Sequence, residues 1–151
     1  MVEVYNNQDA VALSDTILDR LEEVAQLALP LALANPAHGG GVLPELDLVE
    51  VSIVDDPTID QVHRDFMDIS GPTDVITFAH GEIVISVETA QRYAKEYSNG
   101  FERELMLYIV HGLLHLSGHE DAIDSERQAM EKVQFEILEK VWTGTRTEEK
   151  R

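Results

Sequence analysis

The chain has 151 residues, of which 44% are hydrophobic and 26% are charged, a balance typical of one globular domain. It contains no cysteine, which excludes disulfides, thiolate metal sites and cysteine nucleophiles. Eleven basic residues stand against 29 acidic ones, and the formal net charge of −18 argues against loose, non-specific nucleic-acid binding. A nucleic-acid substrate would therefore need a local basic site, a bound cation or a partner.

The first third of the chain predicts a strand, a helix and a loop. Residues 1–6 indicate a short strand because valines alternate with polar residues. Ser14 or Asp15 can cap a helix whose apolar side chains follow the 3.6-residue period. We expect Pro30 to disturb or end this helix. Residues 35–45, with three consecutive glycines between two prolines, predict the main loop.

The middle of the chain predicts three strands around one helix. Residues 46–54 alternate in the manner of a half-buried strand. Pro57 then stands at the expected start of a helix. Two β-branched runs, 74–78 and 82–86, are separated by three residues and predict a hairpin.

The last third of the chain is predicted to be helical over 87–98, 102–117 and about 125–142, and residues 143–151 to be a frayed tail. The order of elements predicts an α+β fold. We expect one domain over residues 1–142, in which a small, roughly four-stranded mixed sheet packs against about five helices.

The N-terminal sequence and the apolar runs indicate where in the cell the protein is expected. The first ten residues, MVEVYNNQDA, lack the basic start and apolar core of a secretion signal. The apolar-rich run at 24–34 is too short to span a bilayer and contains a proline. With the absence of cysteine, these features favour a cytoplasmic protein with no membrane partner.

The strongest chemical signal is HGLLHLSGHED, residues 111–121. It closes a helix that is apolar almost all round and is therefore predicted to be buried at the centre of the fold. His111 and His115 are four residues apart on one face, so both rings can reach one metal ion. The alternative is two buried histidines bonded to backbone carbonyls. We favour the metal, because it offsets the cost of burying two unpaired imidazoles.

A third ligand is expected just after this helix. Gly118 is typical of a helix C-terminus, and the turn that follows can bring His119, Glu120 or Asp121 back to the histidine face. Three protein ligands and one open position are the arrangement of catalytic zinc.

The residue after the first histidine excludes one well-known activity. In HExxH proteases this residue is the glutamate that acts as general base, but here it is Gly112. A glycine inside a helix costs about 1 kcal/mol relative to alanine, so it needs a reason. We expect close approach of a neighbouring backbone or of substrate at this position.

A second group of residues lies upstream. Arg64 is the only lysine or arginine between Arg20 and Arg92. It precedes a turn that leads to Thr73 and Asp74 at the expected start of a strand. Composition alone would make Arg64 a surface charge and the other two ordinary turn residues.

Together the two groups resemble the YbeY family, bacterial rRNA maturation factors thought to act as metal-dependent endoribonucleases. The family pattern is an arginine, a short gap, PTDVLSF, a strand and then HGxLHLxGYDH. This chain has Arg64, PTDVITF at 72–78, EIVIS at 82–86 and HGLLHLSG at 111–118. The match extends over about residues 46–142, and the predicted order of elements is similar to the family's α+β fold.

The resemblance implies one Zn²⁺ per chain, held by His111, His115 and a third residue. The family has a histidine six residues beyond the second ligand, where this chain has Asp121. Either Asp121 binds in place of that histidine, as carboxylates do at zinc sites, or His119 swings in from two positions away. We favour Asp121, because it keeps the register of the motif.

The function that the resemblance implies is cleavage of single-stranded RNA by a metal-dependent endoribonuclease in rRNA maturation and ribosome assembly or quality control. Arg64 and His111 would carry catalysis, and Arg64 and Thr73 would contact the RNA. The implied partners are rRNA and the small ribosomal subunit, with ribosomal proteins or an assembly GTPase as further candidates, and not DNA.

Two other classes of function are also compatible with the sequence. One is a different zinc hydrolase, including a peptidase whose base lies elsewhere, which a peptide cleavage screen would reveal. The other is a non-catalytic ribosome-assembly factor whose metal site is structural or lost. Binding of such a factor to small ribosomal subunits would survive loss of His115.

Overall fold

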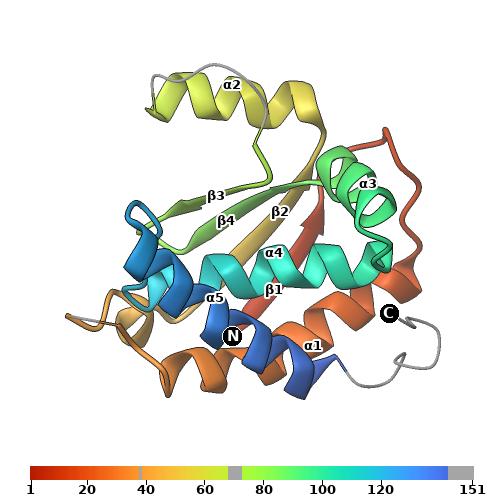
Figure 1. Ribbon diagram of the computed structural model, residues 1–151. Coiled ribbons are helices and arrows are strands. Elements are labelled where there is room, and N and C mark those ends of the chain that lie inside the picture. Colours follow the sequence, from red (N-terminus) through yellow and green to blue (C-terminus); the bar gives the residue numbers. More distant parts are fainter. Residues whose placement is uncertain (38, 68–72, 143–151) are drawn as a thin grey trace.

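The computed structural model describes residues 1–37, 39–67 and 73–142, and the structural statements below concern these residues (Figure 1). The predicted tail, 143–151, lies outside them. The elements in chain order are β1 (Val2–Asn6), α1 (Asp15–Leu33), the 3₁₀ turn η1 (Leu43–Glu45), β2 (Val49–Val54), α2 (Asp56–Met67), β3 (Val75–Phe78), β4 (Glu82–Ser86), α3 (Val87–Glu96), α4 (Phe101–Leu116) and α5 (Asp124–Val141).

The sheet is mixed, and its strand order is β1-β2-β4-β3. β1, β2 and β4 run parallel, while β3 pairs antiparallel with β4 and forms one edge. The predicted hairpin is thus confirmed. Its turn contains Gly81 at φ 106°, where a Cβ atom would lie 2.8 Å from the carbonyl oxygen of Leu48. Four strands in one mixed sheet and five α-helices confirm the predicted α+β class.

The sheet separates two unequal layers of helices (Figure 1). α4 lies under the sheet, with α1 and α5 packed around it, whereas α2 lies alone over the other face. The centre of the fold is the contact between α4 and the sheet, where Leu105, Ile109 and Leu113 have no exposed surface. This buried helix carries the two histidines of the predicted metal site. None of the described helices is both long enough and apolar enough to cross a membrane.

Pro30 does not end α1, which continues to Leu33. The proline lies in the last turns, where it removes only the hydrogen bond to the carbonyl of Gln26. The helix is retained because its buried face, which includes Ala28 and Ala32, still packs in the core. The Pro30 carbonyl itself accepts from Ala34 N–H at 3.0 Å.

Gly112 is explained by packing against β4. A Cβ atom at this position would lie 2.7 Å from two carbons of the Ile83 side chain. The close neighbour is therefore a side chain of the sheet, and the expectation of a backbone or substrate contact was wrong. Glycine lets α4 approach the sheet at the level of the first histidine.

A candidate metal centre at the end of α4

His111 and His115 lie one turn apart near the C-terminal end of α4, and both are half-buried. Their rings meet edge to face, with centroids 4.6 Å apart. The two Nε2 atoms are 3.1 Å apart, so the rings are directed at a common point. This is the arrangement expected of two histidines at i and i+4.

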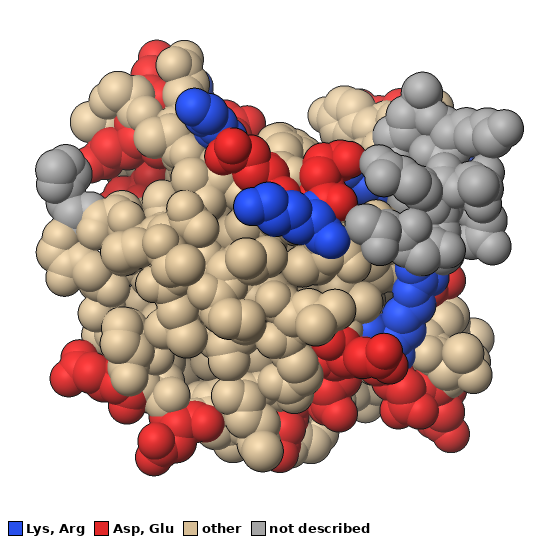
Figure 2. All heavy atoms as spheres, turned by 90° about the horizontal axis from the view of Figure 1, so that it is seen from below, with Lys and Arg blue, Asp and Glu red and all other residues tan. Residues whose placement is uncertain are grey.

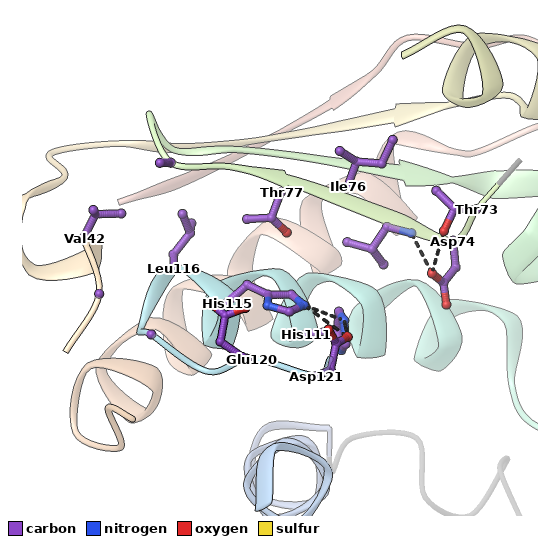
Figure 3. A pocket seen from close by; sticks show the side chains of 14 residues that line it. Val42, Thr73, Asp74, Ile76, Thr77, His111, His115, Leu116, Glu120 and Asp121 are labelled. Carbon is purple, nitrogen blue, oxygen red and sulfur yellow. Dashed lines mark hydrogen bonds and ion pairs between the residues drawn. The ribbon is translucent and has the colours of Figure 1, made fainter. Parts of the chain in front are cut away.

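Asp121 completes the group from the loop that follows α4 (Figure 3). Gly118 takes the left-handed conformation, φ 96°, and His119 N–H donates to the Leu114 carbonyl at 3.0 Å. The chain thereby turns back, and Asp121 Oδ2 lies 3.5 Å from Nε2 of His115 and 3.6 Å from Nε2 of His111. All three candidate ligand atoms lie within 4.8 Å of one another.

Hydrogen bonds at the two Nδ1 atoms determine the tautomer of each imidazole. His115 Nδ1 donates to the backbone carbonyl of His119 at 2.9 Å, and His111 Nδ1 donates to Gln134 Oε1 at 2.7 Å. Because both acceptors are carbonyl oxygens, both Nε2 atoms carry lone pairs toward each other and toward the Asp121 carboxylate. Three electron-rich atoms that converge in this way could hold a metal ion between them.

The separations fit a tetrahedral zinc ion. Two nitrogens bound at the usual Zn–N distance lie about 3.3 Å apart in that geometry. Burial lowers the pKa of His111, and the neighbouring His115 lowers it further. A neutral imidazole is the form that binds a metal, and burial favours this form of His111.

His119, the alternative third ligand, has a different partner. It is 7% exposed, and its Nε2 donates to the carbonyl of Asn35 at 2.7 Å. Val42 N–H donates to the Leu116 carbonyl at 2.8 Å, and a Cβ atom at Gly41 would lie 2.3 Å from that same oxygen. His119 therefore helps to hold the glycine-rich loop against the end of α4. The geometry brings Asp121, and not His119, to the two histidines.

A cavity of about 530 Å³ opens in front of the three residues (Figure 3). Its walls come from the glycine-rich loop, from β3 and the two residues before it, and from the end of α4 with the loop that follows. Thr73 and Asp74 lie in this wall, and Asp74 Oδ1 accepts from Val75 N–H at 2.8 Å. The predicted substrate-contact residue Thr73 therefore faces the same cavity as the candidate ligands. Glu120 also lines it.

Arg64 is not among the described residues that line this cavity. It lies on α2, on the other side of the sheet, with half of its side chain exposed. Its guanidinium pairs with Asp60 at 2.5 Å, one turn away. Residues 68–72, which connect α2 to the strand that lines the cavity, lie outside the described part of the chain.

Gln134 was missed by the sequence analysis. It lies on α5, is 6% exposed and contacts His111 as described above. A signal was present, because Gln134 falls on the same helical stripe as Met130, Ile137 and Leu138, which are buried. A polar residue on an otherwise apolar stripe indicates a buried partner, although it does not say which one.

Fold and site together define a class of protein: an α+β domain with a His-His-Asp group, able to hold a metal ion, at the end of a buried helix. Comparison with known proteins agrees with this class. The family model described as "Endoribonuclease YbeY" matches residues 3–142.

Individual relatives match over almost the whole chain. Endoribonuclease YbeY of Carboxydothermus hydrogenoformans is 33% identical over 147 residues, which cover 91% of this chain and 95% of that protein. Endoribonuclease YbeY of Pelotomaculum thermopropionicum is 33% identical over 150 residues, which cover 89% and 93%. The solution structure of TM1509 from Thermotoga maritima superposes with a TM-score of 0.67 at 26% identity, covering 98% of this chain and 93% of that one. The chain belongs to the YbeY endoribonuclease family.

Proposed function

We propose that this chain is a metal-dependent endoribonuclease that cleaves single-stranded RNA in rRNA maturation and ribosome assembly or quality control. The observation that carries the proposal is the convergence of His111, His115 and Asp121 on one point beside an open cavity. Membership of an endoribonuclease family supports RNA as the substrate. We place this activity in the cytoplasm.

One Zn²⁺ per chain is the proposed cofactor, with His111, His115 and Asp121 as its ligands. When bound, zinc would act as a Lewis acid toward a phosphoryl oxygen and would acidify a bound water. The protein's own contribution is orientation. Gln134 and the His119 carbonyl hold the two rings through their Nδ1 atoms, so that both Nε2 atoms face the cavity.

Recognition of RNA must overcome the charge of the protein. The face of the molecule opposite α2 carries isolated basic groups and scattered acidic ones, without a continuous basic surface in the view of Figure 2. The proposed contacts are therefore local: Thr73 in the cavity wall and Arg64 as a phosphate-binding residue that exchanges Asp60 for the RNA backbone. We further propose that rRNA within the small ribosomal subunit, with ribosomal proteins or an assembly GTPase, brings substrate to this acidic chain.

Glu120 is the candidate general base, because it lines the cavity and makes no part of the ligand group. It is exposed, as a residue that exchanges protons with water needs to be. HExxH peptidases carry their general-base glutamate directly after the first histidine. This chain has Gly112 at that position, so it lacks that base.

The test compares cleavage of one single-stranded RNA, its double-stranded form and DNA of the same sequence by the zinc-loaded chain. We expect cleavage of the single-stranded RNA alone, and no cleavage by His115→Ala protein that remains folded. Zinc-loaded wild-type protein that cuts none of the three, yet binds small ribosomal subunits, would instead be a non-catalytic assembly factor. Cleavage in a peptide library would identify another zinc hydrolase.

A further inference from the structure

Three aromatic rings lie in contact on the α2 side of the sheet, and the proposed mechanism uses none of them. Phe66, near the end of α2, meets Phe78 edge to face, with the ring centroids 5.3 Å apart. The Phe78 ring in turn stacks on the His80 imidazole, with centroids 5.5 Å apart and 21° between the planes. We call these three rings the aromatic row. Phe66 is 69% exposed, as is the side chain of His80, so both ends of the row are open to solvent.

The aromatic row adjoins the cavity in front of the candidate metal ligands. Side chains alternate along β3 and the turn that follows it. Thr77 and Ala79 line the cavity, whereas Phe78 and His80 belong to the row. β3 is also an edge strand of the sheet (Figure 1). A nucleic-acid strand that leaves the cavity can therefore pass around this edge and reach the rings without crossing another β-strand.

Contacts within the protein already orient the rings of the row. Phe78 is half-buried and packs against buried residues of this face, Ile76 and Val84 among them. His80 Nε2 donates to Glu82 Oε1 at 3.2 Å, and Phe78 covers one face of the imidazole. The exposure of the His80 side chain leaves its other face available. A planar group that stacks there meets a ring that is already positioned, which limits the entropy lost on binding.

The size of the row indicates a small, flat ligand. Among the large apolar side chains that are exposed in the described part of the chain, Phe66 is the only one on α2 or β3. One or two exposed rings are far less than the roughly 800 Å² that each partner buries in a stable protein–protein interface. They match the face of one nucleobase, and proteins bind single strands by stacking bases on aromatic side chains. Membership of an endoribonuclease family makes RNA the expected source of such a base.

Stacking also suits the charge of the chain. With a formal net charge of −18, the protein repels phosphates at long range. The described residues that line the cavity include no lysine or arginine. Contact between a base and an aromatic ring needs no basic residue, so the row can supply affinity for RNA where the protein offers little positive charge.

We propose that the aromatic row of Phe66, Phe78 and His80 is a base-stacking platform for single-stranded RNA that passes between the metal cavity and the α2 side of the sheet. One unpaired base stacks on the open face of His80, and a neighbouring base contacts Phe66. The inference rests on the proposed RNA-cleaving function and gives that function a reason for its preference for single strands. Bases held in a duplex cannot present their faces to the rings.

Binding of a short 2′-O-methyl oligoadenylate to the zinc-loaded full chain, measured by fluorescence anisotropy, tests the platform. Phe66→Leu and His80→Ala each remove one ring, and we expect each to weaken binding about five- to tenfold while zinc content stays unchanged. Phe66→Tyr and His80→Phe keep a ring and should bind like the wild type. Tyr97→Leu is the matched control, because Tyr97 is 62% exposed, contacts the ring of Tyr93 and does not line the cavity.

A probe with abasic sugars in place of the adenosines keeps the same phosphates and so separates stacking from charge. We expect the wild type to bind this probe about tenfold more weakly or worse, and Phe66→Leu to bind it like the wild type. The loss of oligoadenylate binding in Phe66→Leu should also be the same at about 50 and 200 mM salt, because a stacked base releases no counterions.

Phe66→Leu and His80→Ala chains that bind the oligoadenylate like the wild type would overturn the proposal, as would equal binding of the abasic probe by the wild type. A Phe66→Leu chain with altered oligomeric state and unchanged RNA affinity would also overturn it, in favour of a contact between copies of the chain. Cleavage assays separate this inference from the function on which it rests. RNA cleavage that both variants retain at the wild-type kcat/KM removes the platform and leaves the nuclease. Ring-dependent binding without RNA cleavage by the wild type removes the nuclease and leaves the platform.

Discussion

The two faces of the sheet are built in different ways. On the face that meets α4, the core is continuous and includes residues of all the helices except α2. On the face that meets α2, four of the described residues form a smaller buried cluster: Val54, Ile59, Ile76 and Val84. Phe66, near the end of α2, is 69% exposed and rests edge to face on Phe78.

α2 is also attached through polar contacts at its first residue. Asp56 accepts hydrogen bonds from Ser86, Thr89 and Arg92, and its N–H donates to Glu88. The candidate metal ligands therefore stand on the tightly packed side of the sheet, while Arg64 stands on the lightly packed side. A metal site needs fixed geometry, whereas a residue that binds a phosphate backbone tolerates adjustment.

Truncation of one apolar side chain on each face of the sheet should show the difference in packing most strongly. Leu113→Ala on α4 removes a fully buried side chain and should lower the free energy of unfolding by about 2–5 kcal/mol. Val62→Ala on α2 removes a half-buried side chain and should cost about 1 kcal/mol or less. Denaturant unfolding measures both, and equal losses would contradict the proposed difference between the faces.

Gly112→Ala tests how closely α4 approaches the sheet. The added methyl group overlaps Ile83, and we expect a loss of about 1–3 kcal/mol despite the better helix propensity of alanine. Ile83→Ala removes the atoms that clash. In the double variant the two losses should therefore not add, and simple additivity in unfolding experiments would show that Ile83 is not the cause.

Asp56→Ala tests the polar attachment of α2 and should cost about 1–2 kcal/mol at neutral pH. Burial acts to raise the pKa of Asp56, but hydrogen bonds from Ser86, Arg92 and Thr89 outweigh it and hold the pKa below its ordinary value. The stabilisation is therefore present above the unfolded-state pKa of about 3.9 and is lost as the pH falls through the folded-state pKa. Unfolding curves of variant and wild type should converge below about pH 4, and a constant gap would contradict this reading.

Arg64→Ala should have the smallest effect on stability, about 0.5 kcal/mol or less, because its ion pair with Asp60 is largely exposed. The same change should weaken RNA binding and leave zinc content intact. A variant that binds metal and processes RNA like the wild type would remove Arg64 from the proposed site.

The residues that sequence patterns located are those whose geometry is set within a few positions of the chain. His111 and His115 meet because they are one helical turn apart, and the hairpin of β3 and β4 follows from two β-branched runs with a short gap. Asp121 is brought back by a glycine turn only a few residues long.

The features that sequence patterns did not settle depend on contacts between distant segments. Gln134 reaches His111 from another helix, His119 bonds to Asn35 across 84 positions, and Gly112 makes room for a side chain of β4. No local period encodes these pairings. Pro30 belongs to the same group, because packing of α1 in the core overrides the local signal to stop.

Zinc content per chain, measured by elemental mass spectrometry on wild type, Asp121→Ala and His119→Gln, tests the central claim most directly. We predict close to one zinc per chain in the wild type and in His119→Gln, and loss of that zinc in Asp121→Ala. A wild-type chain that holds no stoichiometric metal after zinc is offered would contradict the metal centre. Zinc that survives in Asp121→Ala but is lost in His119→Gln would move the third ligand to His119.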